Sequence, residues 1–135
     1  MTRRQFLKKS KKALKDTSHL RVMVIEITGK EDKGKISPGE VEEKWETIRQ
    51  EIESIFAGYE KIKPPSKCIS FYRRILNILI SFQEMVSYKK DYILQEDLNK
   101  EKIEKKRQKT SKQMEILWSD FKTLNEEVNT LLCKK

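Results

Sequence analysis

The chain has 135 residues, of which 38% are charged and 36% are hydrophobic, and its formal net charge is +9. This length suits a single domain with a buried core, and the apolar and aromatic content is too high for a wholly disordered protein. The high charged fraction, set against few glycines and prolines, favours long helices with solvated faces.

The sequence gives no indication of secretion or of membrane insertion. Its longest apolar run, around residues 78–80, is far too short to span a bilayer, and no apolar stretch of signal-peptide length follows the basic N-terminus. Cys68 and Cys133 lie far apart, which favours free thiols in a reducing compartment. We therefore expect an intracellular protein, cytoplasmic, or nuclear if the organism is eukaryotic.

The first 36 residues predict two different elements. Residues 2–14 indicate a short basic helix, because Phe6, Leu7 and Leu14 share one side and Lys or Arg occupies most of the rest. Residues 20–28, LRVMVIEIT, are rich in β-branched side chains and favour one isolated strand. Three alternatives stay open for this strand: pairing with residues 35–37, pairing with another protein, or incorporation into a helix by packing.

A complete capping signal marks the start of the next helix. Ser37 is the expected N-cap, Pro38 takes the first helical position, and Glu40 follows three residues after the cap. Apolar residues from 41 to 62 then recur at alternating spacings of four and three, the period of helices that pack at a shallow angle. We expect this helix to end before the prolines at 64 and 65.

Two apolar stripes run along the predicted second helix, which extends from Ser66 to about Leu94. One stripe contains Leu79, and the other contains Ile75 and Phe82. A helix that is apolar on two sides packs between two neighbours, so these three side chains are predicted to be almost wholly buried. The aromatic residues predicted to be core rather than base-stacking platforms are Trp45, Phe71, Phe82, Trp118 and Phe121.

The third predicted helix covers residues 98–132. Its apolar seam is clear from Met114 to Leu131 but weak before that, so whether residues 98–113 are helical and docked stays open. The predicted fold is all-α: an antiparallel three-helix bundle over residues 37–135. Residues 1–36 add the short basic N-terminal helix and the strand-like or extended segment.

No residue pattern reaches a catalytic or metal-binding signature. Residues 29–36, GKEDKGKI, have the glycine spacing of a P-loop, but Ile36 stands where Ser or Thr must hold magnesium. His19 is the only histidine, and the glutamates between residues 42 and 53 indicate a solvated helix face rather than an acid–base pair. We predict no enzyme, no metal, no cofactor and no small-molecule substrate.

Two lysine-rich segments could neutralise phosphates, an attraction that needs no sequence-specific contact. Residues 3–15 hold seven basic residues and no acid, and residues 100–112 hold seven with only Glu101 and Glu104. The predicted nucleic-acid-binding residues are Arg3, Arg4, Lys8, Lys9, Lys11, Lys12, Lys15, Lys105, Lys106, Arg107 and Lys109. Alternatively, these segments are solvated helix faces or nuclear import signals. The N-terminal helix has too few apolar residues on one face for us to expect membrane binding.

The helical seams also suggest a protein partner or self-association. A two-sided second helix, a polar gap over residues 104–113 and an unpaired strand would leave surfaces of a lone chain unsatisfied. We therefore predict a non-catalytic helical interaction or scaffold subunit of a larger, nucleic-acid-associated assembly. The alternative is a small basic protein that binds DNA or RNA directly through its lysine-rich ends. The partner, the oligomeric state and the choice between DNA and RNA stay open.

Overall fold

Helices make up nearly all of the computed structural model of the chain. It describes residues 1–35, 37–94 and 100–133, and within the helices it describes residues 31, 32, 38, 88–94, 100–107, 110 and 111 by their backbone alone. The elements are α1 (Arg3–Asp32), α2 (Pro38–Glu60), the short 3-10 helix η1 (Ser66–Cys68), α3 (Ile69–Leu94) and α4 (Lys100–Cys133).

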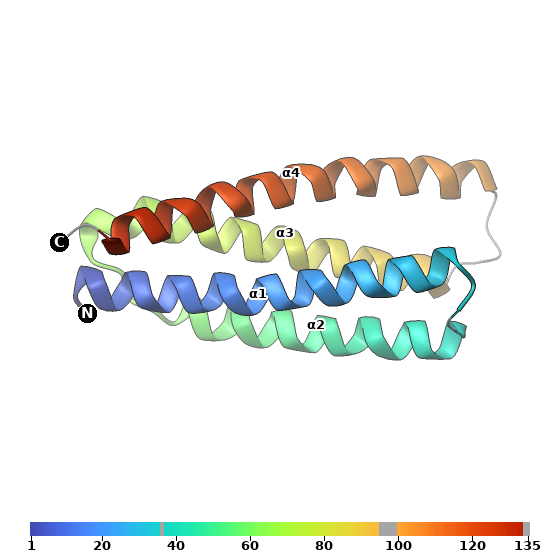
Figure 1. The fold of residues 1–135 in the computed structure, drawn as a ribbon, viewed down its shortest axis with the longest axis horizontal. Helices are drawn as coiled ribbons and strands as arrows, with labels where there is room; N and C mark the ends of the chain where they lie inside the picture. Colours follow the sequence, from blue (N-terminus) through green and yellow to red (C-terminus); the bar gives the residue numbers. More distant parts are fainter. Residues whose placement is uncertain (36, 95–99, 134–135) are drawn as a thin grey trace.

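The four long helices lie side by side along the long axis of the molecule, and each runs opposite to the one before it (Figure 1). α1 packs against α2 and α4, and α3 packs against the same two helices. This arrangement encloses one core along the bundle axis. The N-terminus, the end of α4 and the segment that joins α2 to α3 all lie at the same end of the bundle (Figure 1).

Residues 20–28 are not a strand, because they continue α1 without a break; of the alternatives left open by the sequence, incorporation into a helix by packing is the one found. Leu20, Val24 and Ile27 follow the alternating spacing of four and three and are buried, whereas Val22 and Ile25 are 53% and 56% exposed. Burying three large apolar side chains is worth about 1.5–3 kcal/mol each. The helix-propensity deficit of β-branched residues is only about 0.5 kcal/mol each, so packing decides for helix.

The predicted three-helix bundle is corrected to a four-helix bundle for the same reason. The N-terminal helix is not a short appendage, since Phe6, Leu14 and Leu20 belong to the same buried cluster as the apolar residues of α2, α3 and α4. The Arg21 guanidinium also lies over the Trp118 ring of α4, 4.8 Å from its centroid. α1 is therefore the fourth helix of the bundle.

A capping box starts α1. The Thr2 hydroxyl accepts a hydrogen bond from the Gln5 backbone N–H at 3.1 Å, and the Gln5 side-chain oxygen accepts one from the Thr2 backbone N–H at 2.9 Å. These two bonds satisfy backbone donors that the first turn of a helix otherwise leaves free. The reciprocal pair defines the start of the helix although the neighbouring side chains are charged.

The predicted cap of α2 is confirmed. Ser37 has an extended backbone, and its hydroxyl accepts a hydrogen bond from the Glu40 backbone N–H at 3.3 Å. Pro38 begins the helix, where its missing N–H costs nothing. α2 ends at Glu60, before the two prolines.

The predicted core positions of α3 are confirmed as well. Ile75, Leu79 and Phe82 are 0% exposed, and α3 packs against both α2 and α4 as its two apolar stripes require. Phe82 meets the Trp118 ring edge-on, with the ring centroids 5.4 Å apart. All five aromatic residues predicted to be core are buried: Trp45, Phe71, Phe82, Trp118 and Phe121.

α4 is helical from Lys100, so residues 100–113 are helix, whereas residues 98 and 99 of the predicted helix lie outside the described residues. The second half of α4 carries the buried residues, which run from Leu117 to Val128. The side chains that the structure describes between residues 108 and 113 are exposed. Among the described side chains of α4, the buried ones therefore lie in its second half.

Candidate nucleic-acid interface

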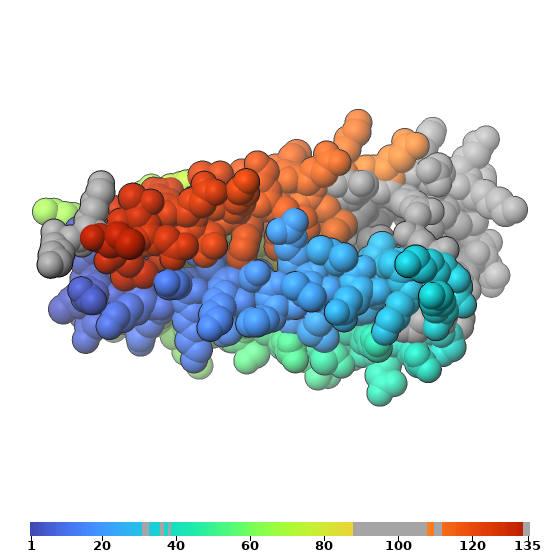
Figure 2. All heavy atoms as spheres, viewed as in Figure 1, coloured from blue at the N-terminus to red at the C-terminus, as the bar shows by residue number. Residues whose placement is uncertain are grey.

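Seven basic side chains cover the outer face of the first half of α1. We call these the N-terminal basic surface: Arg3, Arg4, Lys8, Lys9, Lys11, Lys12 and Lys15. All seven are exposed, because the apolar face of this half of the helix, Phe6, Leu7 and Leu14, turns into the core. The first half of α1 and the second half of α4 lie side by side at one end of the molecule (Figure 2).

An aromatic cluster fixes this half of α1 against the neighbouring helices. The Phe6 ring lies 6.5 Å from Tyr59, 6.3 Å from Phe71 and 6.5 Å from Tyr72, measured between centroids. Below it, the hydroxyls of Ser10 and Tyr59 form a buried hydrogen bond of 2.8 Å. The basic side chains therefore stand on a rigid base rather than on a frayed terminus.

The second predicted cluster is not brought together with the first. The side chains of Lys105, Lys106 and Arg107 lie outside those that the structure describes, and Lys109 is exposed. Their part of α4 lies at the end of the bundle opposite to the start of α1 (Figure 1). The eleven predicted residues thus divide between two ends, and only the N-terminal group is described as a complete surface.

Four exposed basic residues outside the predicted set lie in and around the link between α2 and α3, at the end of the bundle where α1 begins (Figure 1). Lys61 follows α2, Lys63 is in the following link, Lys67 is in η1 and Arg73 is in the second turn of α3. We call residues 61–73 the α2–α3 corner. Its basic residues are not contiguous in the sequence, and the packing of Phe6 on Tyr59, Phe71 and Tyr72 brings the corner next to the start of α1.

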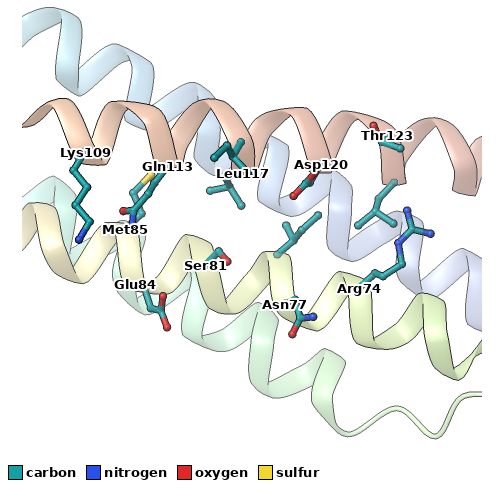
Figure 3. A pocket seen from close by; sticks show the side chains of 13 residues that line it. Arg74, Asn77, Ser81, Glu84, Met85, Lys109, Gln113, Leu117, Asp120 and Thr123 are labelled. Carbon is teal, nitrogen blue, oxygen red and sulfur yellow. The ribbon is translucent and has the colours of Figure 1, made fainter.

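A groove of about 740 Å³ runs between α3 and α4 (Figure 3). Its apolar lining includes Ile78 and Leu117, and Ile116 on its wall is 64% exposed. Arg74 and Glu127 form an ion pair of 2.9 Å between the two helices. Glu84, Lys109 and Asp120 also line the groove, so it offers both apolar contact and charge.

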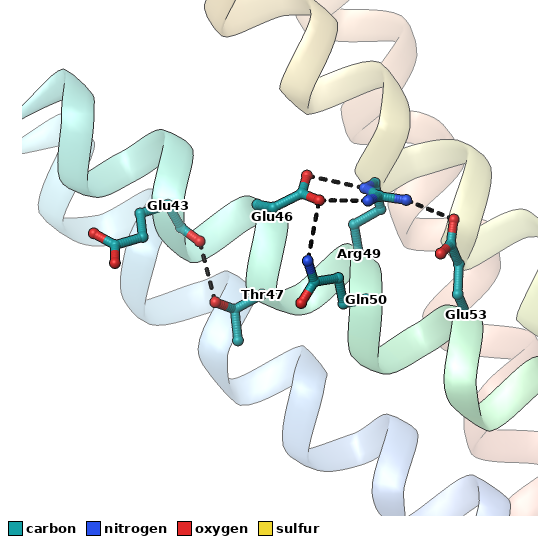
Figure 4. Close-up of polar contacts among 6 residues, drawn as sticks. All are labelled: Glu43, Glu46, Thr47, Arg49, Gln50 and Glu53. Atoms are coloured by element: carbon teal, nitrogen blue, oxygen red, sulfur yellow. Dashed lines mark hydrogen bonds and ion pairs between the residues drawn. The ribbon is translucent and has the colours of Figure 1, made fainter.

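Two acidic residues on α2, Glu46 and Glu53, pair with the same arginine. Arg49 lies between Glu46 and Glu53, donating to the Glu53 carboxylate at 2.7 Å and to both oxygens of Glu46 (Figure 4). The hydrogen bonds that Arg49 donates to Glu46, together with the nearby negative charges, raise the pKa of the Arg49 guanidinium above its ordinary value. Glu46 and Glu53 thus belong to an ion-pair cluster along α2.

The remaining candidates from the sequence are the histidine, the P-loop-like segment and the two cysteines. His19 is exposed on α1, and Gly29 to Asp32 form the last turn of that helix, so no strand precedes the P-loop-like segment. Cys68 is a buried free thiol and Cys133 an exposed one. Within the described residues, no three His, Cys, Asp or Glu side chains gather where they could hold a metal ion.

Burial changes the acidity of two tyrosines under the N-terminal basic surface. Burial raises the pKa of Tyr59 well above its ordinary value of about 10, and the hydrogen bond with Ser10 opposes this only in part. The pKa of Tyr72 is raised by burial and then by the charge of Glu60. Both phenols stay neutral at physiological pH, so they contribute packing and hydrogen bonds to the surface and no charge.

A comparison with protein families, curated proteins and solved structures finds no match to this chain. In the described part of the chain, a helix both long and apolar enough to cross a membrane is absent.

Proposed function

We propose that this chain is a non-catalytic helical-bundle protein that binds nucleic acid by its phosphate backbone, through the N-terminal basic surface. The observation that carries the proposal is that all seven basic residues of the first half of α1 are exposed on one packed helix with no acid among them. Lysine and arginine on such a surface neutralise phosphates and release condensed counterions, which favours binding without reading sequence.

Packing within one chain removes most of the reasons for expecting a helical partner. The strand that lacked a partner is part of α1, and the two apolar stripes of α3 are covered by α2 and α4. The side chains of Val24, Ile75 and Val128 are 0% exposed, although each lies on a different helix. Direct binding therefore has better support than a scaffold role.

The charge at the start of α1 supports the same proposal. Arg3 and Arg4 occupy the first turn, which contains no acid, at the positive end of the helix dipole. Cations there are unfavourable by about 0.3–1 kcal/mol each at low ionic strength. A bound phosphate reverses the sign of this interaction, and local conflicts of this kind are expected at functional sites.

The composition of the surface favours backbone contact over base reading. Five of its seven residues are lysines, which act as point charges, whereas arginine supplies the bidentate geometry that reads guanine. The nearby aromatic rings of Phe6, Tyr59 and Phe71 are buried, so they offer no platform on which a base could stack.

Fluorescence anisotropy with a labelled duplex of about 20 base pairs tests the proposal. The logarithm of the binding constant should fall with the logarithm of salt concentration, with a slope of about 0.9 per phosphate contact. Changing Lys8, Lys9, Lys11 and Lys12 to Gln should flatten this slope by up to about 3 to 4. Lysine and glutamine have similar helix propensities, so the fold should persist.

A matched control removes four positive charges from the opposite end of the bundle. Lys30, Lys33, Lys35 and Lys44 lie in the last turn of α1, the following link and the start of α2, and their change to Gln lowers the net charge by the same amount. We expect the control to keep most of the wild-type slope. Absence of salt-dependent binding at about 50 mM salt, or tighter binding to polyglutamate than to the duplex, would overturn the proposal.

A second candidate function is an interaction subunit, and the α3–α4 groove is the observation that favours it. Its apolar lining and the exposed Ile116 resemble a surface that an amphipathic helix can cover. Light scattering over a range of protein concentrations tests self-association, and Ile116→Lys should then reduce it. A wild-type chain that stays monomeric throughout would argue against self-association.

A further inference from the structure

The α2–α3 corner adds four positive charges to the end of the bundle where α1 begins. Lys61, Lys63, Lys67 and Arg73 are all exposed. Arg74 is not counted with them, because its guanidinium pairs with Glu127. In the sequence the four residues are spread over residues 61–73 and separated by two prolines, so no contiguous basic motif announces them.

Packing places these charges next to the start of α1. The Phe6 ring contacts Tyr59 at the end of α2 and both Phe71 and Tyr72 at the start of α3, with centroids 6.3–6.5 Å apart. The Tyr72 hydroxyl donates to the Glu60 backbone carbonyl at 2.7 Å, which holds the two sides of the corner together. Arg3 and Arg4 lie within one turn of Phe6, so they share this end of the bundle with the corner.

Few acids oppose these charges. No acid occurs between residues 61 and 83 of the sequence, Glu60 precedes the corner, Asp16 follows the N-terminal basic surface, and Glu127 on α4 is paired with Arg74. α1 and α3 both begin here, and neither has an acid in its first turn, so the partial positive charge of the helix starts adds to that of the side chains. The end of the bundle is therefore strongly positive over three elements.

We infer that the α2–α3 corner is a second phosphate-contacting segment, so that a nucleic-acid duplex is held across the end of the bundle by α1 and the corner together. This inference rests on the proposed function and names its ligand more closely. A surface of exposed cations with buried aromatic rings responds to charge density, and a duplex carries one charge per about 1.7 Å of its axis. Single strands would need stacking platforms for comparable affinity.

The test compares two variants of equal charge in the full chain. The corner variant changes Lys61, Lys63, Lys67 and Arg73 to Gln, and the control variant is the one already described, with Lys30, Lys33, Lys35 and Lys44 changed. With a labelled duplex of about 20 base pairs, the corner variant should lose up to about 3 to 4 from the salt slope. It should also bind the duplex at least about tenfold more weakly than the control variant at 0.1 M salt, where the Debye length is about 10 Å.

Circular dichroism and thermal unfolding establish that both variants keep the bundle, since all the changed side chains lie outside the buried core. Single changes of Lys67 and Arg73 should each lower the slope by about 0.9. A corner variant whose slope and affinity match those of the control overturns the inference and leaves the proposed function standing. If the wild-type chain binds no duplex, both the inference and the proposed function are refuted. Tighter binding of a single strand of equal length refutes only the assignment of a duplex as the ligand.

Discussion

The buried hydrogen bond between the hydroxyls of Ser10 and Tyr59 should show strong non-additivity when its two partners are changed. The two oxygens are 2.8 Å apart between α1 and α2, and the Tyr59 residue is 2% exposed. Ser10→Ala leaves the phenol buried without this partner, which costs about 1–3 kcal/mol, reduced by about 0.5 kcal/mol because alanine favours helix. Tyr59→Phe should cost about 1 kcal/mol, because a helical serine can turn its hydroxyl to the carbonyl four residues earlier.

The double variant removes both hydroxyls, so neither is left buried without a hydrogen-bond partner. We expect its unfolding free energy to fall by no more than the larger single change, which gives an interaction energy of about 1–2 kcal/mol. Urea unfolding followed by far-ultraviolet circular dichroism measures all four proteins of the cycle. Thr17→Ala is the control, since Thr17 is buried and donates to the Ala13 carbonyl at 2.8 Å, about 10 Å along α1 from Ser10. Combined with Tyr59→Phe it should be additive within about 0.5 kcal/mol, and the same additivity for Ser10→Ala would refute the reasoning.

Three further outcomes are expected. Ser37→Ala should lower the unfolding free energy by about 1 kcal/mol, because the Glu40 N–H loses its acceptor, and no measurable loss in urea unfolding would show that the cap is not formed. Phe82→Ala should cost about 3–5 kcal/mol in the same assay, against less than about 1 kcal/mol for the partly exposed Ile80→Ala, and similar costs for the two would contradict the burial of Phe82. Burial raises the pKa of Tyr59 in the folded chain, so above about pH 10 the unfolded chain loses a proton that the folded chain keeps. Stability should then fall as pH rises, by up to about 1.4 kcal/mol per pH unit for this group, and a Tyr59→Phe variant with an unchanged pH slope would disprove this.

The sequence predicted correctly those parts of the fold in which a local pattern is compatible with only one structure. The Ser37 cap and the two-sided pattern of α3 belong to this class, because capping and burial each follow directly from position in a helix. Residues 20–28 do not, since their β-branched content supports a strand until α2 and α4 supply a surface against which Leu20, Val24 and Ile27 can pack. A missed signal was nonetheless present, as Thr2 and Gln5 have the spacing of a capping box and mark the helix start.

The candidate interface was only half predictable for a related reason. A run such as residues 3–15 is visible because its charges are contiguous, and a helix exposes them all once its apolar side is buried. Lys61, Lys67 and Arg73 are separated by prolines and other uncharged residues, and their neighbours in space are set by where Phe6 packs. Tertiary contact, and not sequence spacing, decides which charges share a surface.

The opposite placement of the two lysine-rich segments sets the size of a ligand that covers both over their full length. α1 has 30 residues, and at about 1.5 Å per residue it spans about 45 Å, close to the distance between the ends of the bundle. Along B-form DNA that length corresponds to about 13 base pairs. A duplex that contacts both segments over their full length must therefore lie parallel to the bundle axis over at least that length. A duplex too short to bridge the two segments can occupy only one of them, which would leave the other open to a second molecule and make the binding stoichiometry depend on duplex length.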